Sequence, residues 1–353
     1  MISKDHLLQV LTAGTRAPSG DNSQPWKFVV REDNVEVFVV PEKDQSLYNF
    51  NLRGSMVAHG ALIENCTIAA RTLGYRMDTQ LFPDLKNENL VARLAFTPAT
   101  PEHDPLFDAI AKRNTNRKVY NSTPLTDKER TDLLNSQISS EGHVQLEENR
   151  AVIASIAKAA STNERVLFEN RHLHDFFFDH VRWTVDEEIT HGGGFYFKTL
   201  EVGAPFPLFK LLRKWGAMKF FNKLGMSKKI GRENEKVFAS ARAFGMIVMP
   251  GRSARDYVAA GRIFQRIWLT ATHLGLALQP MMGVLFLHEN IELGKADTFN
   301  SDEIARIKDA YQVLRETFHI PQGTGALLFR VGHSNPPSAM ASRIPIEQLT
   351  IFL

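Results

Sequence analysis

The pattern of apolar and polar positions predicts a chain of mixed helices and strands. Apolar residues cover most sides of segment 54–74, and a helix with that pattern is buried rather than at the surface. A second long helix is expected over 254–275. We expect further helices over 3–15, 105–112, 126 onward, 151–160, 164–182 and 301–317, and strands over 27–31, 35–40, 90–96, 246–249 and 326–331.

An internal repeat links the two long helices. They align without a gap at an offset of 201 residues, and each follows a strand pattern that ends in proline, Pro41 or Pro250. Shared small residues let two helix backbones approach closely, although buried helices in general are rich in Ala, Gly and Leu. The identical pairs are Val57/Val258, Ala58/Ala259, Gly60/Gly261, Ala70/Ala271, Leu73/Leu274 and Gly74/Gly275. We therefore predict an α+β fold of two similar lobes, residues 1–100 and 101–353, forming a pseudo-dimer around these helices.

The composition is that of an ordinary globular chain, and it excludes several classes of protein. With 43% hydrophobic and 23% charged residues, the 353-residue chain has ample core for two domains. A net charge of +3 is too small to indicate a nucleic-acid-binding protein, and no run of about 18 apolar residues predicts a membrane-spanning helix. The single cysteine, Cys66, excludes an internal disulfide, and no apolar run after Met1 suggests a signal peptide. We expect a cytoplasmic protein.

A polar segment joins the first helix to the first strand. Residues 16–26 read Arg-Ala-Pro-Ser-Gly-Asp-Asn-Ser-Gln-Pro-Trp, a composition that interrupts regular structure. The hydroxyl and carboxamide groups of Ser19, Asn22 and Gln24 are of the kind that read the edge of a flat heterocycle. An ordinary Asx-rich loop has the same composition.

A basic segment follows the helix pattern of 105–112. In an extended chain Arg113, Thr115 and Arg117 lie on one side, because alternate residues share a side. Two guanidinium groups and a hydroxyl suit a phosphate group, to which arginine donates paired hydrogen bonds. A solvated basic turn remains the alternative.

The polar loop resembles the SSxNSQPW-type loop of the nitroreductase superfamily, whose members are FMN flavoproteins. In that family the loop reaches across a dimer interface to the flavin of the other subunit. The segment 113–117 is similar to the family's Arg-x-Ser-x-Arg/Lys flavin segment, and 342–345 is similar to its Lys-x-Arg-x-Pro phosphate segment. Among the branches of the family, the sequence looks most like the tandem, single-chain Acg-like group.

The resemblance implies which residues would hold FMN. Arg113 and Arg343 would bind the phosphate, and Arg117 would lie near the ribityl or pyrimidine part of the flavin. Residues 279–283 match the family's Pro-x-Glu-Gly segment, whose backbone N–H approaches flavin N5. The implied set is Pro18, Ser19, Asn22, Gln24, Arg113, Asn114, Thr115, Arg117, Pro280, Met281, Met282, Gly283 and Arg343.

Two positions depart from the family's pattern. Met282 stands where the family has an acid, and Ala341 stands where it has a lysine. Met282 keeps a backbone N–H donor near N5, because that donor does not depend on the side chain. Ala341 removes a positively charged contact. The family's Asn and Lys for the flavin pyrimidine correspond loosely to the region of Arg232, Asn234 and Lys236, and the register there stays open.

The two lobes carry complementary parts of one site. The first lacks an Arg-x-Thr-x-Arg segment, and the second has only Ile138–His143 where the first has Pro18–Trp26. Each lobe supplies half of the residues for one site, so we expect one FMN per chain. The second position related to it by the repeat should hold no FMN.

A basic, aromatic segment is expected to form a lid over the flavin, within residues 185–235. Residues 198–236 hold ten Lys/Arg against three Glu, a local charge of +7 that leaves −4 for the rest of the chain. Nucleic acid or an anionic membrane surface is the alternative partner for this segment. His172, His174 and Asp175 belong to a polar helical segment that we interpret as a hydrated surface, with no metal site.

These features predict an FMN-dependent oxidoreductase of nitroreductase type. Reduced NAD(P)H would pass hydride to flavin N5, and an electron-poor acceptor such as a nitroaromatic or quinone would then occupy the same slot, which gives ping-pong kinetics. No protein catalytic residue is required. The alternative is an FMN storage or sensing protein without nicotinamide-driven turnover. We expect no nucleic-acid or membrane partner and a monomeric pseudo-dimer, with further dimerisation left open.

Overall fold

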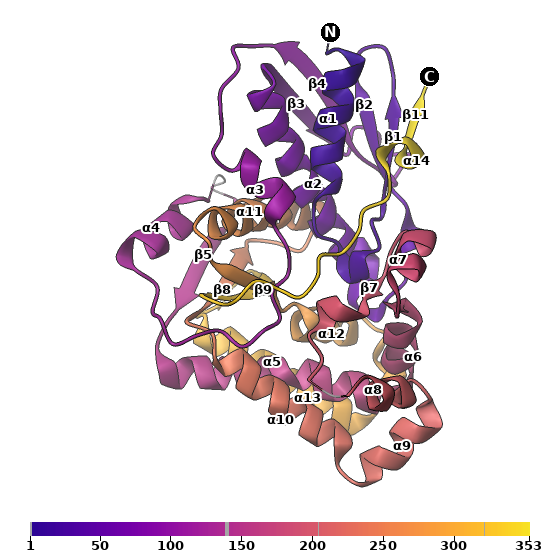
Figure 1. Cartoon of the computed structure of the whole chain (residues 1–353), viewed down its shortest axis with the longest axis vertical. Coiled ribbons are helices and arrows are strands. Elements are labelled where there is room, and N and C mark those ends of the chain that lie inside the picture. Colours follow the sequence, from indigo (N-terminus) through magenta and orange to yellow (C-terminus); the bar gives the residue numbers. More distant parts are fainter. Residues whose placement is uncertain (1, 138–140, 204, 321) are drawn as a thin grey trace.

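The computed structural model describes residues 2–137, 141–203, 205–320 and 322–353, and it confirms the α+β class (Figure 1). The helices are α1 Lys4–Thr15, α2 Arg53–Thr72, α3 Phe107–Lys112, α4 Asp127–Asn135, α5 Arg150–Glu169, α6 Arg171–His180, α7 Val185–His191, α8 Phe206–Leu212, α9 Trp215–Lys223, α10 Met226–Ala239, α11 Ala254–His273, α12 Gly283–Glu292, α13 Ser301–Thr317 and α14 Ile346–Leu349. The strands are β1 Trp26–Val30, β2 Val35–Val39, β3 Tyr75–Leu81, β4 Leu90–Pro98, β5 His143–Glu147, β6 Val181–Arg182, β7 Phe195–Tyr196, β8 Ala243–Met249, β9 Ala277–Pro280, β10 Thr324–Gly332 and β11 Thr350–Phe352. Residues 138–140, part of the segment Ile138–His143 considered above, lie outside the described residues.

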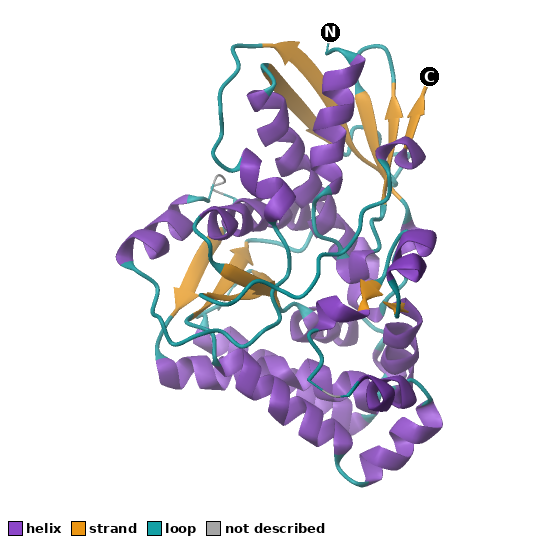
Figure 2. Ribbon diagram, viewed as in Figure 1, coloured by secondary structure: helices purple, strands orange, loops and turns teal. Residues whose placement is uncertain are grey.

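Two larger sheets lie on either side of the central helices (Figure 2). The first has the strand order β11-β1-β2-β4-β3, and the second has the order β5-β8-β10-β9. The C-terminal strand β11 pairs in parallel with β1, so the end of the chain returns to the sheet of the N-terminal part. This return carries residues 339–345 past the polar loop before β1, so a segment expected to bind phosphate lies beside the loop expected to read the edge of a heterocycle.

The central strands of the second sheet, β8 and β10, are buried on both faces. Every residue of β8 is buried, and alternate side chains enter different clusters: Ile247 packs in the core around α2 and α11, whereas Met246 packs with α5, α10 and α13. Alternate side chains of a strand point to opposite faces, which explains the continuous apolar pattern. Helix α5 is therefore fixed against this sheet, with one end directed toward the site.

Helices α2 and α11 cross at two glycines. A Cβ atom on Gly60 would lie 2.0 Å from the carbonyl oxygen of Val258, and one on Gly261 would lie 2.1 Å from that of Val57. These four residues are two of the repeat pairs, and their contacts are reciprocal. Two helices related by a local two-fold axis make contacts of this kind. The crossing supports the division into two lobes, which stays a prediction.

Two residues of α2 have the structural roles that the sequence predicts. Cys66 is buried, and burial raises the pKa of its thiol to about 12, so it is not a reactive thiolate. His59 is buried between the carbonyl oxygens of Ser55 and Phe38, at 2.7 and 3.3 Å from its ring nitrogens, and burial lowers its pKa. Both side chains belong to the packing of the core.

Several boundaries differ from the prediction. Helix α5 runs unbroken through residues 161–163, and the break comes at Asn170, whose side chain accepts from Leu173 N and caps α6. The polar residues 161–163 lower helix propensity, but packing against α10 and α13 overrides it. Strand β3 and helix α12 were not predicted.

The expectation of a hydrated histidine surface is wrong for His174. Its side chain is buried, and its Nε2 lies 2.9 Å from the carbonyl oxygen of Leu212, so it joins α6 to α8. No group of metal-ligating side chains occurs among the described residues. Within the same residues, no helix combines the length and the apolarity that crossing a bilayer requires.

Candidate active site

The loop before β1 has a strained backbone that the rest of the chain holds in place. Asp21, Asn22 and Gln24 have φ angles of 48°, 54° and 49°, in the left-handed region that few non-glycine residues adopt. Ser19 Oγ accepts from Gln24 N at 3.0 Å and closes the turn. Such strain persists only where surrounding contacts fix the loop, and it is common at functional sites.

The C-terminal tail supplies those contacts. Gln24 Oε1 accepts from Ile344 N at 2.9 Å, and Asn22 Nδ2 donates to the carbonyl oxygen of Ser342 at 3.2 Å. Arg343 Nη1 donates to Asn22 Oδ1 at 2.9 Å. The predicted loop and the predicted phosphate segment are therefore direct neighbours, although 321 residues separate Asn22 from Arg343.

A small cavity of about 80 Å³ lies where the loop, the tail and the segment after α3 meet. Its cationic lining comes from Arg16, Arg113, Arg117 and Arg343. Arg113 Nη2 and Arg343 Nη2 both donate to the carbonyl oxygen of Arg16, at 2.9 and 3.3 Å. The other lining residues are Pro18, Ser19, Asn22, Asn114, Thr115, Phe195, Thr199, Ala339, Met340 and Ala341.

Few negative charges act on the arginines of the small cavity: Asp21 and Glu201 attract Arg117, and Glu188 attracts Arg343. Within the described residues, no carboxylate forms an ion pair with Arg16, Arg113 or Arg343, and their hydrogen bonds go to carbonyl and amide oxygens. Burial, followed by the charges of Arg343 and Arg16, lowers the pKa of Arg113 well below its usual value. Burial also lowers the pKa of Arg343 to about 10. Buried cations are costly without a counter-charge, so this cavity suits an anion of the size of phosphate.

Arg113 is held from a second side by the central helices. Its guanidinium lies over the ring of Trp268 on α11, 4.3 Å from the centroid. Arg117 donates to the carbonyl oxygen of Thr199 at 2.9 Å and lies 5.5 Å from the ring centroid of Phe195. Both arginines are thus oriented before any ligand binds.

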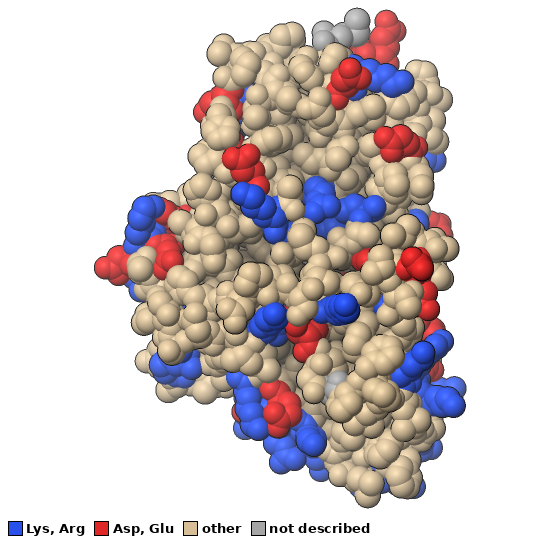
Figure 3. All heavy atoms as spheres, in the orientation of Figure 1, with Lys and Arg blue, Asp and Glu red and all other residues tan. Residues whose placement is uncertain are grey.

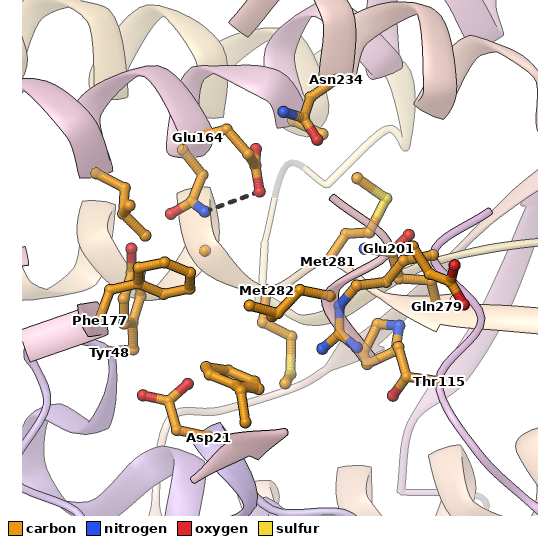
Figure 4. Close-up of a pocket in the computed structure, with 18 of the residues that line it drawn as sticks. Asp21, Tyr48, Thr115, Glu164, Phe177, Glu201, Asn234, Gln279, Met281 and Met282 are labelled. Carbon is orange, nitrogen blue, oxygen red and sulfur yellow. Dashed lines mark hydrogen bonds between the residues drawn. The ribbon is translucent and has the colours of Figure 1, made fainter. Parts of the chain in front are cut away.

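A larger cavity of about 1190 Å³ adjoins the small one. Pro18, Ser19, Thr115, Arg117 and Phe195 line both. Most of the lining is apolar, and a few polar side chains from different parts of the chain point inward, among them Asp21, Tyr48 and Glu164 (Figure 4). A mainly apolar pocket with a few convergent polar groups is typical of a cofactor or substrate site.

Asn163 and Glu164 on α5 form a polar pair in the larger cavity. Asn163 Nδ2 donates to Glu164 Oε1 at 3.2 Å, while Asn163 Oδ1 and Glu164 Oε2 are buried without a partner in the described structure (Figure 4). Burial raises the pKa of Glu164 to about 7. The pair can therefore offer both donors and acceptors to a heterocycle.

The segment after β9 forms another part of the same wall. Pro280, Met281, Met282 and Gly283 all line the larger cavity. Helix α12 begins at Gly283, and the first N–H groups of a helix have no partner within it. A Cβ atom on Gly283 would lie 2.2 Å from Asn163 Oδ1, so glycine is required for the amide to occupy this place.

Of the predicted site residues, Gln24 alone lines neither of the two cavities. It is fully buried, and its carboxamide is occupied by the backbone of Gly192, at 3.3 Å, and of Ile344. Its place in the structure is that of a positioning residue for the loop. The other twelve predicted residues line one cavity or both, which brings together segments from the beginning, middle and end of the chain.

Sequence reasoning missed Arg16 and the pair Asn163 and Glu164. Arg16 is the first residue of the polar segment 16–26, and its charge at the start of that segment was a usable signal. It lines the small cavity beside Ala341, the position where the resemblance expects a lysine. Asn163 gave no local signal because it lies within a helix. In the region whose register stayed open, Asn234 lines the larger cavity, and Lys236 pairs with Glu233 at 2.8 Å.

The segment expected to form a lid walls part of the larger cavity. Its contributions come from β7, from residues 200–203 and from helices α8 and α10. Figure 3 shows Lys and Arg side chains at the lower right of this face, the region of α8 and α9 in Figure 1. The glycines 192–194 approach the loop closely, since a Cβ atom on Gly193 would lie 3.1 Å from the carbonyl oxygen of Asn22.

Comparison with known proteins gives relatives among nitroreductases. A Mycobacterium tuberculosis (strain CDC 1551) protein of uncharacterized function is 26% identical over 348 residues, which cover 95% of this chain and 46% of that protein. "Putative NAD(P)H nitroreductase Rv3131" of M. tuberculosis H37Rv is 30% identical over 118 residues, 33% of this chain and 34% of the relative. The chain thus spans about half the length of the first relative, and its match covers about a third of the second. No family profile matches the chain.

Several solved structures also align with this one. A nitroreductase with bound FMN from Desulfitobacterium hafniense DCB-2 aligns with a TM-score of 0.38 and 11% identity, over 71% of this chain and 100% of that chain. A BluB-like flavoprotein from Clostridium difficile 630 aligns with a TM-score of 0.40 and 11% identity, over 70% and 98%. The predicted resemblance is confirmed to this extent: the chain has nitroreductase-like relatives.

Proposed function

We propose that the protein is an FMN-dependent oxidoreductase that transfers hydride from NAD(P)H to an electron-poor small molecule such as a nitroaromatic or a quinone. One observation carries the proposal: a small cavity lined by unpaired arginines opens beside a large, mainly apolar cavity, and the two share five lining residues. An anionic tail joined to a flat heterocycle matches this pair of cavities.

The residues present fit FMN in three respects. Arg16, Arg113 and Arg343 would hold the phosphate, since arginine donates paired hydrogen bonds to phosphate oxygens. Arg117, at the junction of the cavities, would lie beside the flavin ring or its ribityl chain. The unpaired atoms of Asn163 and Glu164 would bond the polar edge of the ring, and the N–H groups at the start of α12 would donate to it.

When bound, FMN would supply the hydride chemistry, accepting from a reduced nicotinamide and passing hydride on to the acceptor. The chain's own part would be orientation and electrostatics. Arg117 would oppose negative charge gathered on the ring, and the apolar walls would keep water from the reacting face. This division agrees with the expectation that no protein nucleophile or catalytic triad is needed.

Flavin storage or sensing is the second candidate. Two observations favour it: α8 and α10 wall the cavity, and Met282 stands where the resemblance expects an acid. The two candidates share the cofactor and differ in access by a nicotinamide. In either case we expect one FMN per chain, held between two lobes of a monomeric pseudo-dimer.

Anaerobic mixing of the purified protein with NADH or NADPH separates these candidates. Loss of the visible absorbance of oxidised flavin within the turnover times of ordinary enzymes supports the oxidoreductase. Return of the colour on addition of a quinone then completes the cycle. A spectrum unchanged by either nucleotide contradicts the oxidoreductase and supports storage or sensing.

A further inference from the structure

One side of the larger cavity is lined mainly by apolar side chains. The whole cavity, at about 1190 Å³, exceeds the roughly 300–1,000 Å³ typical of sites for one drug-sized ligand. Many of the lining residues on the side of α5, α6, α8 and α10 belong to one hydrophobic cluster, distinct from the clusters of the two sheets. Its members include Leu167, Phe177, Leu200, Phe209, Leu212 and Ile230. We call this side the apolar chamber.

Three polar residues that line the cavity near the apolar chamber have partners within the protein. Glu201 accepts from the hydroxyl of Ser338 at 2.9 Å, and Asn234 Nδ2 donates to the carbonyl oxygen of Ile230 at 3.0 Å. Glu233 is exposed and pairs with Lys236 at 2.8 Å. A ligand part that enters the chamber therefore meets hydrocarbon walls, in contrast to the polar pair on α5.

The outer wall of the chamber is fixed to the rest of the fold. His174 on α6 is buried and bonds the carbonyl oxygen of Leu212 at the end of α8. Its ring also contacts Trp215 on α9, with centroids 5.1 Å apart. Asn222 Nδ2 donates to the carbonyl oxygen of Phe168 at 2.6 Å, which ties α9 to α5. These contacts fix α6, α8 and α9 relative to α5, and the apolar chamber is lined by α5, α6 and α8 among these helices.

Resting on the proposed function, we propose that the apolar chamber binds the hydrocarbon tail of the electron acceptor, and that this acceptor is a lipid-soluble quinone with an alkyl side chain. The electron-poor ring would occupy the part of the cavity near Pro280–Gly283, and the tail would lie among Leu208, Phe209 and Ile230. The overall reaction balances as NAD(P)H, one proton and the quinone giving NAD(P)⁺ and the hydroquinone.

A chain-length series tests the chamber by binding alone. The dissociation constants of 1,4-naphthoquinones bearing no chain or an alkyl chain of increasing length are measured by equilibrium dialysis, with the protein both FMN-loaded and as purified. We expect the constant to fall about three- to fourfold for each added methylene, until the chamber is full, as follows from about 0.8 kcal/mol per buried methylene. A constant independent of chain length overturns the proposal.

Two variants on α8 provide the matched comparison. Leu208→Trp fills the chamber, because Leu208 lines the cavity, and we expect it to abolish the dependence on chain length. Leu211→Trp adds the same bulk to an exposed position of the same helix and should leave the dependence intact. Equal behaviour of the two variants overturns the proposal.

The same samples separate this proposal from the proposed function. If the protein retains no FMN but still binds long-chain quinones more tightly, the chamber stands and the oxidoreductase proposal fails. If FMN is bound and reduced by NAD(P)H but chain length has no effect, the chamber fails and the oxidoreductase proposal stands.

Discussion

Arg113 and Arg343 donate hydrogen bonds to one acceptor, the carbonyl oxygen of Arg16, at 2.9 and 3.3 Å. The two arginines stand 230 positions apart in the chain, and neither forms an ion pair with a carboxylate among the described residues, although Glu188 attracts Arg343 from a greater distance. Two buried cations brought to one carbonyl are repulsive by themselves, and the charge of Arg343 contributes to the lowered pKa of Arg113. An anion between them would relieve this repulsion, and the first two predictions follow from it.

Replacement of Arg113 by alanine should weaken FMN binding. A hydrogen bond to a charged group contributes about 1.5–3 kcal/mol, so we expect a loss of about 10- to 100-fold in affinity. Titration of flavin-free protein with FMN, followed by quenching of flavin fluorescence, measures it. Arg76→Ala removes an exposed arginine paired only with Asp78 and should bind like the wild type. Equal FMN affinities of R113A and R76A would contradict the assignment of the phosphate to this cavity.

Arg16→Ala should have an effect of the same kind, by about tenfold. Arg16 lines the small cavity beside Ala341, so we interpret it as the cation that takes the place of the family's lysine. The double variant R16A/A341K tests this interpretation by returning the charge from the tail. We expect the double variant to recover FMN affinity. An FMN affinity of R16A equal to that of the wild type would contradict the interpretation that Arg16 takes the place of the family's lysine.

The glycine crossing predicts a large loss of stability. Gly60→Ala or Gly261→Ala would place a methyl group about 2 Å from a backbone carbonyl oxygen, which cannot move without separating α2 from α11. We expect each to lower the free energy of unfolding by about 3 kcal/mol, as overpacking of a rigid core does. Urea denaturation measures this quantity.

Gly216→Ala is the control for the glycine variants. Gly216 lies in helix α9 with no atom within 4 Å of an added Cβ, so alanine should be neutral or stabilising by up to about 1 kcal/mol. Similar stabilities for G60A and G216A would show that the two central helices are not in close contact.

The carboxyl group of Glu164 predicts a pH dependence of stability. Burial raises its pKa from 4.5 to about 7, so the folded protein binds a proton that the unfolded chain releases at lower pH. The free energy of unfolding of flavin-free protein should therefore fall as pH rises from about 4.5 to about 7, and then level off. Glu164→Gln should reduce this slope, and Asp21 keeps a share of it because burial also raises the pKa of that carboxyl to about 7. An equal slope in wild type and E164Q would contradict the assigned pKa.

Much of the site could be predicted because its parts are short local segments. The loop 16–26 and the segment 113–117 are recognisable from residue types and spacing alone. The starts of α1 and α4 also follow local rules, because Ser3 caps the first helix and Thr126 forms a capping box with Glu129 at the second. The matched glycines of α2 and α11 predict that the two helices pack closely, because only closely approaching backbones require glycine at both positions.

The remaining features depend on contacts between distant segments. Asn163 and Glu164 enter the site only because α5 packs on the second sheet and Gly283 leaves room for the amide. The sequence predicts Gln24 as a ligand-binding residue because nothing in it shows a partner for the carboxamide. In the fold, that carboxamide instead accepts a hydrogen bond from Ile344 N of the C-terminal tail. His174 was likewise predicted to be solvated, because the sequence does not show that α8 packs over it.

The bound flavin of the purified protein tests the central claim most directly. The protein is denatured, the released cofactor is identified by chromatography, and its amount is compared with the amount of chain. We predict FMN at one molecule per chain, after saturation with added FMN if the preparation is partly loaded. A colourless protein that takes up no added FMN, or one that binds two per chain, would contradict the single site built from the loop, the arginines and the tail.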